Sequence, residues 1–305
     1  MKKAIITGST GLVGLSVARY FAAIGIDVLC LGRQTLGTEG AHRHFGASAT
    51  YLNLAMEDIL SLANQLDVIG WSPGDECVFF NFAWGGDQKL TDGGYGIQLS
   101  NAIHAANAVR AAKDIGCVKF VNLGTLEETY AEQYLIGKDE HLYQSSQTDY
   151  ALAKLAARDL CKMVAYMEKL DYVHTRLSVP LAPDLSRGSY VAQTLKKIAE
   201  GKLYTAPKSK RLFDIVFTDD VARAYHLVGK DGKNKANYFI GTSRPAKLAD
   251  YFDFFAQQVS GTGKGKLETW GEAESLFFST ESIFEDTGFV ATTQIEDIIQ
   301  CLRNS

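Results

Sequence analysis

The stretch that decides the fold is Thr7-Gly8-Ser9-Thr10-Gly11-Leu12-Val13-Gly14, close to the start of the chain. It follows a short apolar run at residues 4–7 and opens a stretch of helical apolar periodicity at residues 12–24. Glycines at these three positions suit a tight turn, a close backbone approach to a pyrophosphate, and close packing of a helix on a strand. The N–H groups at the start of such a helix attract phosphate. At the first strand-to-helix junction, this turn predicts a dinucleotide-binding site.

The first half of the chain alternates short apolar runs with helical patterns. The expected strands span residues 4–7, 28–31, 50–54, 77–82, 120–123 and 172–177, and the expected helices span 12–24, 56–66, 98–114 and 150–170. This alternation is typical of strand-helix-strand units that build a parallel sheet with helices on both faces. We therefore expect an α/β fold with a Rossmann-type, doubly wound parallel sheet, whose ligand crevice lies at the carboxyl ends of the strands.

After Leu177 the pattern changes, because prolines and glycines precede a helical pattern at 190–200 and an apolar run at 212–217. This change indicates that the chain leaves the sheet, builds part of a smaller lobe and returns. We expect a dinucleotide-binding domain of residues 1–177 plus about 212–241, and a C-terminal substrate-binding lobe of about 178–211 plus 242–305.

Composition excludes several classes of protein. The 305 residues are 46% hydrophobic and 22% charged, which is ordinary for a globular chain. The net charge is −4 and no basic block occurs, so we expect no nucleic-acid partner. The apolar runs are too short for a signal peptide or a membrane span. The five cysteines are widely separated and lack zinc or redox spacing, which predicts reduced thiols in a cytoplasmic protein without a bound metal.

The second expected strand ends in Leu29-Cys30-Leu31-Gly32-Arg33. An Asp or Glu at this point normally accepts a hydrogen bond from the 2′-hydroxyl of the adenosine ribose, and this chain has none. Arg33 instead offers a planar, permanently charged guanidinium that suits a 2′-phosphate. We therefore predict that the chain prefers NADP(H) to NAD(H).

Tyr150 and Lys154 are four residues apart in a helical pattern, so their side chains share one face. A nearby ammonium favours the tyrosinate and is expected to lower the pKa of Tyr150 from its ordinary value of about 10. Upstream, the strand at 120–123 leads into Gly124 and Thr125, whose hydroxyl could bond the substrate oxygen that Tyr150 protonates. By itself, a Tyr and a Lys at this spacing is also common on exposed helix surfaces.

The glycine turn, Thr125 and the Tyr150–Lys154 pair follow one another in the order of the extended short-chain dehydrogenase/reductase family, which the chain resembles. This group contains nucleotide-sugar epimerases, 4,6-dehydratases and ketoreductases. The resemblance is strong for residues 1–183 and looser beyond. It implies a catalytic triad of Thr125, Tyr150 and Lys154, a nucleoside-diphosphate sugar as substrate, and a homodimer formed through the helices at 98–114 and 150–170.

The resemblance also implies a set of cofactor contacts along the first half of the chain. They are Gly8, Thr10, Gly11, Leu12, Val13, Gly14, Arg33, Asn53, Leu54, Phe82, Ala83, Trp84, Tyr150 and Lys154. Within this set, Asn53 matches a polar residue beside the adenine, and residues 82–84 match the loop that passes the cofactor. Asn101 matches an Asn that recurs in the helix after that loop.

Departures from the family pattern bear on the reaction. Related 4,6-dehydratases carry Thr-Asp-Glu where this chain has Thr125-Leu126-Glu127. The missing Asp is the general acid for loss of the 6-hydroxyl, which disfavours dehydration, although Glu127 or Glu128 is still a candidate for contact with the sugar. A solvated loop acid is the other interpretation of these two residues.

Two further departures concern substrate binding. Val179 stands where many relatives carry a substrate-contacting Asn, and Phe213 stands where many carry a phosphate-binding Arg. Arg187 or Arg211 is the candidate to hold the diphosphate instead, against the simpler interpretation of both as surface arginines.

The function expected from the sequence is NADPH-dependent reduction of a nucleoside-diphosphate keto-sugar at C4, with Tyr150 as proton donor. One alternative is a nucleotide-sugar 4-epimerase, or a 4,6-dehydratase using Glu127, that retains its NAD(P). Another is a dinucleotide sensor without enzymatic activity. A reductase consumes NADPH in proportion to product, whereas the alternatives do not.

Overall fold

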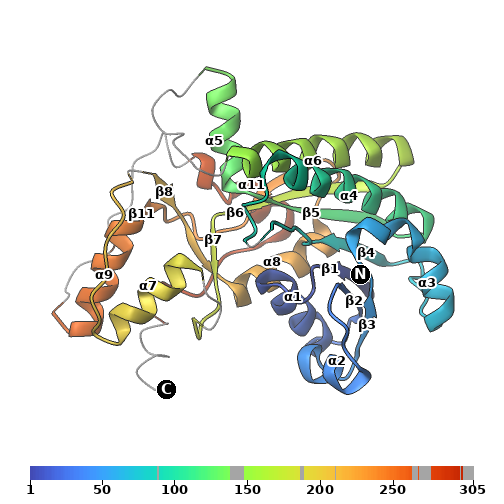
Figure 1. Cartoon of the computed structure of the whole chain (residues 1–305), viewed down its shortest axis with the longest axis horizontal. Coiled ribbons are helices and arrows are strands. Elements are labelled where there is room, and N and C mark those ends of the chain that lie inside the picture. Colours follow the sequence, from blue (N-terminus) through green and yellow to red (C-terminus); the bar gives the residue numbers. More distant parts are fainter. Residues whose placement is uncertain are drawn as a thin grey trace.

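The computed structural model describes residues 1–87, 89–137, 148–185, 189–209, 211–262, 267, 276–295 and 297. Its centre is a seven-stranded sheet in the order β10-β6-β5-β4-β1-β2-β3 (Figure 1). The strands are β1 (Lys3–Thr7), β2 (Asp27–Gly32), β3 (Ala49–Asn53), β4 (Cys77–Asn81), β5 (Lys119–Thr125), β6 (Asp171–Leu177) and β10 (Asn237–Phe239). Each neighbouring pair is parallel. The expected doubly wound α/β fold is confirmed, with the reversal of strand order between β1 and β4.

Helices cover both faces of this sheet, as Figure 1 shows. One layer contains α3 (Leu62–Ile69), α4 (Gly94–Asp114) and α6 (Thr148–Glu168), and the other contains α1 (Leu12–Ala23), α2 (Thr38–Phe45) and α8 (Thr218–Asp231). Each layer packs on the sheet through its own buried apolar cluster. Because both faces of the central strands are buried, strands such as β4 are apolar at nearly every position rather than alternating.

Two helical segments differ from the sequence-based expectation. Residues 56–66 were expected to form one helix, but they form a 3-10 helix η1 (Met56–Ser61) followed by α3. Its N-cap, Ala55, has no side-chain acceptor, and the Asp58 N–H instead closes a tighter turn onto the Ala55 carbonyl. The helix α5 (Leu126–Leu135) was not expected, and it begins directly after the last residue of β5.

The second half of the chain adds a smaller group of elements beside the sheet. They are β7 (Val179–Leu181), α7 (Tyr190–Ala199), β8 (Leu212–Phe213), β9 (Ile215–Phe217), β11 (Ala246–Lys247), α9 (Leu248–Ser260), η2 (Leu276–Phe278) and α11 (Glu281–Thr287). Strand β9 pairs with β7, and β8 pairs with β11. One apolar cluster joins β7, β9 and β11 with α7 and α9, whereas Ile283 of α11 packs into the cluster of α1 and α8.

The strand that rejoins the seven-stranded sheet is β10, so the expectation that residues 212–217 return to it is wrong. The carboxylate of Asp214, between β8 and β9, is fully buried and accepts hydrogen bonds from the N–H groups of Thr242 and Ser243. These bonds tie the segment to the residues after β10, beside the sheet rather than within it. The domain boundaries expected from the sequence stay a prediction.

The described cysteines, Cys30, Cys77, Cys117 and Cys161, are all buried and free, and Cys301 lies outside the described residues. None of the helices in the described ranges combines the length and apolar character that a membrane crossing needs.

Phe80 is a residue of β4 whose side chain packs against α1 and α8, and replacing it tests how much this packing stabilises the fold. It is fully buried and makes edge-to-face contacts with Phe21 and Tyr225, with ring centroids 5.2 and 6.2 Å away. We expect Phe80→Ala to lower the free energy of unfolding by about 3–5 kcal/mol, because the cavity it leaves cannot fully close. Urea denaturation measures the loss.

Val68→Ala on α3 is the control, because Val68 is 82% exposed, and it should change the unfolding free energy by less than about 0.5 kcal/mol. Equal losses in the two variants would contradict this description of the core.

Candidate active site

A cleft of about 880 Å³ opens at the carboxyl ends of the strands, where the strand order reverses. This volume lies within the range of about 300–1,000 Å³ that is usual for ligand sites. The predicted site residues that line it are Gly8, Thr10, Gly11, Leu12, Val13, Gly14, Arg33, Leu54, Phe82, Ala83, Trp84, Thr125 and Tyr150. Residues from five strands and their following segments are therefore brought together at one edge of the sheet.

The glycine turn packs directly against the loop that follows β4. Gly8 has a φ of 62°, and a Cβ there would lie 2.8 Å from the backbone nitrogen of Ala83. A Cβ on Gly14 would lie 2.3 Å from the carbonyl oxygen of Gly8. Only glycine fits at these two positions. The start of α1 has no side-chain cap, so its first N–H groups are available to an anion such as a pyrophosphate.

Arg33 lies on the wall of the cleft just beyond β2, and it is exposed. It forms no hydrogen bond or ion pair with any residue in the described part of the chain. Asn53 lies beside the cleft rather than on its wall, because its side-chain amide donates to the Thr35 hydroxyl at 3.2 Å. The residue after it, Leu54, does line the cleft, and contact of Asn53 with the adenine stays a prediction.

The loop after β4 is held by two side chains of α4. Asn101 accepts the Gly85 N–H at 2.9 Å and donates to the Gly85 carbonyl at 2.7 Å. Gln98, fully buried, accepts the indole N–H of Trp84 at 2.8 Å. The sequence analysis singled out Asn101 and missed Gln98, although the two are three residues apart on one helix face. Together they fix Trp84 against the cleft.

Tyr150 and Thr125 both line the cleft, and both are buried. The Thr125 side chain lies beside the Tyr150 phenol. Burial raises the pKa of the Tyr150 phenol well above its ordinary value. Tyr150 is therefore a neutral phenol in this structure, which is the form that donates a proton.

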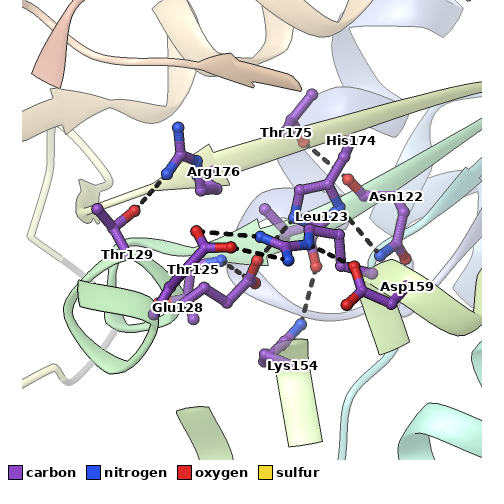
Figure 2. Close-up of polar contacts among 12 residues, drawn as sticks. Asn122, Leu123, Thr125, Glu128, Thr129, Lys154, Asp159, His174, Thr175 and Arg176 are labelled. Carbon is purple, nitrogen blue, oxygen red and sulfur yellow. Dashed lines mark hydrogen bonds and ion pairs between the residues drawn. The ribbon is translucent and has the colours of Figure 1, made fainter. Parts of the chain in front are cut away.

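Lys154 is buried one helical turn away, but it does not face the cleft. Its ammonium donates to the Leu123 carbonyl at 2.9 Å (Figure 2) and lies 3.9 Å from the centre of the Trp84 ring. Burial lowers its pKa to about 8. The expected lowering of the Tyr150 pKa is therefore wrong for this structure, since desolvation of the phenol dominates and the ammonium is directed at Leu123 and Trp84.

Glu128, a sequence candidate for contact with the sugar, lies buried on α5, so it is not a solvated loop residue, and it does not line the cleft. Thr125 caps α5, and Glu128 completes a capping box by accepting the Thr125 backbone N–H at 2.8 Å. The Thr-x-x-Glu spacing before a helix is the signal that could have revealed it. The other carboxylate oxygen of Glu128 lies 2.8 Å from the Nε2 atom of His174, on β6 (Figure 2).

Two of the candidate substrate residues contact each other. The Arg211 guanidinium donates to the Glu127 carboxylate at 2.7 Å, in a largely buried ion pair, and lies over the ring of Tyr130 at 4.4 Å. The pairing offsets the charge of each side chain, and neither lines the cleft. Arg187, the other candidate for the diphosphate, lies outside the described residues. Among the described residues, no group of His, Cys, Asp and Glu side chains is suited to hold a metal ion.

Several known structures share this architecture. The UDP-glucose 4-epimerase of Thermotoga maritima, solved with UDP-glucose, is 16% identical, with 99% of this chain and 97% of that chain covered at a TM-score of 0.71. The Bordetella bronchiseptica enzyme WbmG, solved with NAD and UDP, is 16% identical, with 100% and 94% covered and a TM-score of 0.72. WbmH of the same organism, solved with NAD⁺, is 21% identical, with 98% and 96% covered and a TM-score of 0.70. At these identities the likeness shows a common fold.

None of the curated proteins matches the sequence. The family model described as "NAD dependent epimerase/dehydratase family" matches residues 4–241, which run from the first strand of the central sheet to just past the last. Because that match covers most of the chain and includes the whole dinucleotide cleft, the chain belongs to the NAD-dependent epimerase/dehydratase family.

Proposed function

We propose that the chain is a cytoplasmic, NADPH-dependent reductase that acts on the C4 carbonyl of a nucleoside-diphosphate keto-sugar. The observation that carries this proposal is Arg33, a cation on the wall of the dinucleotide cleft where an acid would select NAD(H). Reductive biosynthesis commonly draws on NADPH, and a reductase exchanges its cofactor in every cycle. The buried free thiols are in keeping with a cytoplasmic protein.

The cleft fits such a cofactor by its chemistry. The glycine turn and the uncapped start of α1 offer backbone N–H groups to the pyrophosphate, and Arg33 offers a bidentate fork to the 2′-phosphate. When bound, the cofactor supplies a hydride for the carbonyl carbon of the substrate. Trp84 and Tyr150 lie side by side on the wall of the cleft, with ring centroids 6.0 Å apart, and that carbonyl would lie beside them.

Tyr150 transfers its phenolic proton to the carbonyl oxygen, which completes the alcohol. Burial keeps the phenol protonated before the reaction, and the Thr125 hydroxyl, beside Tyr150, orients the same oxygen. The resulting tyrosinate is favoured by the nearby Lys154 ammonium, whose centre lies 5.9 Å from the Tyr150 ring centroid. A proton from solvent then restores the phenol.

The nucleoside diphosphate is proposed to be the part of the substrate by which the protein holds it, and its bonds do not change in the reaction. Structures of similar fold were solved with UDP-glucose or UDP. Arg211 is the proposed diphosphate ligand among the described residues, and this role requires its ion pair with Glu127 to open. A Glu127 carboxylate released in this way would lie beside the sugar.

A 4-epimerase with retained dinucleotide is the second candidate, because the solved structure of a UDP-glucose 4-epimerase shares the fold over nearly the whole chain. It would use Tyr150 and Thr125 in both directions and consume no NADPH. A 4,6-dehydratase is disfavoured, because Leu126 occupies the position of the required acid.

We also propose a homodimer formed through α4 and α6, which lie side by side on one face of the sheet (Figure 1). The two helices expose large apolar side chains, including Ile103 and Met163, each 57% exposed, and Tyr166, which is 71% exposed. A patch of this kind on a folded protein is typical of an interface, because it removes apolar area from water when covered.

Tyr150→Phe tests the reaction. Wild-type protein should consume NADPH in proportion to alcohol formed from a 4-keto sugar nucleotide. The variant should lose about 10²- to 10⁴-fold in turnover, because the general acid is gone. NADPH oxidation and calorimetric titration measure turnover and cofactor affinity, and the affinity should be unchanged.

Tyr190→Phe, a change at an exposed tyrosine of α7 outside the cleft, is the matched control and should be fully active. Turnover without net NADPH consumption would favour the epimerase, and undiminished activity of the Tyr150 variant would remove the proposed mechanism.

Arg33→Ala tests the cofactor preference. Charge-assisted hydrogen bonds to the 2′-phosphate are worth about 1.5–3 kcal/mol, so the variant should bind NADPH about 10- to 100-fold more weakly. NADH affinity should stay the same, and calorimetric titration of both cofactors measures the difference. Arg110→Ala, at an exposed arginine outside the cleft, serves as control. Equal affinity of wild-type protein for both cofactors would contradict the preference for NADPH.

Ile103→Glu tests the dimer. A charge buried in an apolar interface is costly, so the variant should be monomeric at micromolar concentration where the wild type is dimeric. Sedimentation velocity distinguishes the two states. Val68→Glu, on the exposed side of α3, should leave the dimer intact. A monomeric wild type, or a dimeric Ile103 variant, would show that this face is not the interface.

A further inference from the structure

We propose that Glu128 and His174 form a buried positioning pair that sets the catalytic Thr125 in place. The inference rests on the proposed function, in which Thr125 is a catalytic residue. Glu128 and His174 themselves do not line the cleft. Both residues act through the backbone at the end of β5, where the strand passes directly into α5.

Glu128 uses both of its carboxylate oxygens inside the protein. One accepts the Thr125 backbone N–H at 2.8 Å, and the other lies 2.8 Å from the Nε2 atom of His174 (Figure 2). Glu128 is 1% exposed, whereas capping a helix requires only one of these contacts and no burial. The second contact goes beyond helix capping, because it joins the start of α5 to His174 on β6.

His174 ties this carboxylate to the sheet. Its Nδ1 atom lies 3.4 Å from the side-chain amide of Asn122 and 3.3 Å from the Tyr172 hydroxyl. Asn122 in turn accepts a hydrogen bond from Asn81 at 2.9 Å, and Thr7 donates to Asn81 at 2.7 Å. These side chains form a polar row across β6, β5, β4 and β1, which ends beneath the glycine turn.

Gly124 shows how closely the pair fits the backbone it holds. A Cβ at this position would lie 2.3 Å from Glu128 Oε1 and 2.4 Å from His174 Nε2. The carboxylate and the imidazole thus occupy the space that a side chain before Thr125 would need. Both groups therefore lie directly against the backbone at the end of β5.

The charge of Glu128 is maintained within this enclosure. Burial opposes its ionisation, but the facing His174, the Lys154 ammonium and the Thr125 N–H outweigh burial and hold the pKa of the carboxyl below its ordinary value. An ionised carboxylate accepts stronger hydrogen bonds than a neutral one. The Thr125 amide is therefore anchored firmly, and its hydroxyl is kept in reach of Tyr150.

Glu128→Leu removes both acceptors and roughly keeps the side-chain volume, so it tests the inference. We expect turnover to fall about 10- to 100-fold, as for a displacement of a reacting group by about 1 Å. NADPH affinity should not change, because the pair lies outside the cleft. Glu128→Gln should restore most of the turnover, because its amide oxygen accepts the Thr125 N–H and its amide N–H can donate to Nε2 once His174 carries its proton on Nδ1, facing the Tyr172 hydroxyl.

A double-mutant cycle with Thr125→Val separates positioning from a structural loss. If Glu128 acts through Thr125, adding Glu128→Leu to the Thr125→Val variant should reduce turnover by less than about twofold further. Glu132→Gln is the matched control, since Glu132 lies one turn along α5 in an ion pair with Arg158 and is 42% exposed. Additive losses, or a fully active Glu128→Leu variant, would overturn the proposal.

Hydrogen exchange of the wild-type protein tests the pair without a variant and without a substrate. It therefore still applies if Glu128→Leu does not fold or if the protein does not reduce a keto-sugar. In wild-type protein the Thr125 amide should exchange as slowly as the central amides of β5, because it is bonded to a buried carboxylate. Exchange orders of magnitude faster would overturn the pair. Absence of keto-sugar reduction by wild-type protein would instead remove the proposed function and leave this measurement valid.

Discussion

The site depends on one close backbone approach, between the glycine turn after β1 and the loop after β4. The Thr7 hydroxyl accepts the N–H groups of Phe82 and Ala83 at 3.2 Å each, and Gly8 leaves no room for a side chain between the two segments. Strand order reverses at this point, so the helices that follow β1 and β4 diverge to opposite faces of the sheet. The divergence opens the cleft.

The buried polar side chains below the cleft need hydrogen-bond partners inside the protein, because an unpaired buried polar group costs free energy. The row from Thr7 through Asn81 and Asn122 to His174 and Glu128 meets that requirement, as each member bonds the next. The same row connects the phosphate-binding end of the cleft with the end that carries the reacting hydroxyls. The two ends of the cleft are therefore held by one continuous set of hydrogen bonds.

Lys154 illustrates how the position of a side chain depends on its surroundings. The spacing of Tyr150 and Lys154 places both on one face of α6, and that much is a property of any helix. The carbonyl of Leu123 and the face of Trp84 then attract the ammonium away from the cleft wall, and Gln98 holds Trp84 in place. The pKa of Tyr150 follows desolvation rather than the ammonium, so proton donation is favoured over proton removal in this state.

The parallel α/β sheet and the glycine turn could be predicted from the sequence, because periodicity and short spacings translate directly into backbone geometry. The candidates Thr125, Tyr150 and Lys154 needed the family resemblance as well, since a Tyr and a Lys at that spacing are common on exposed helices. The sequence could not predict the pairing of 212–217 with β7 and β11, the ion pair of Glu127 with Arg211, or the contact of Glu128 with His174. Each joins residues tens of positions apart, and burial of charge and hydrogen-bond satisfaction selects such partners only after the chain has folded.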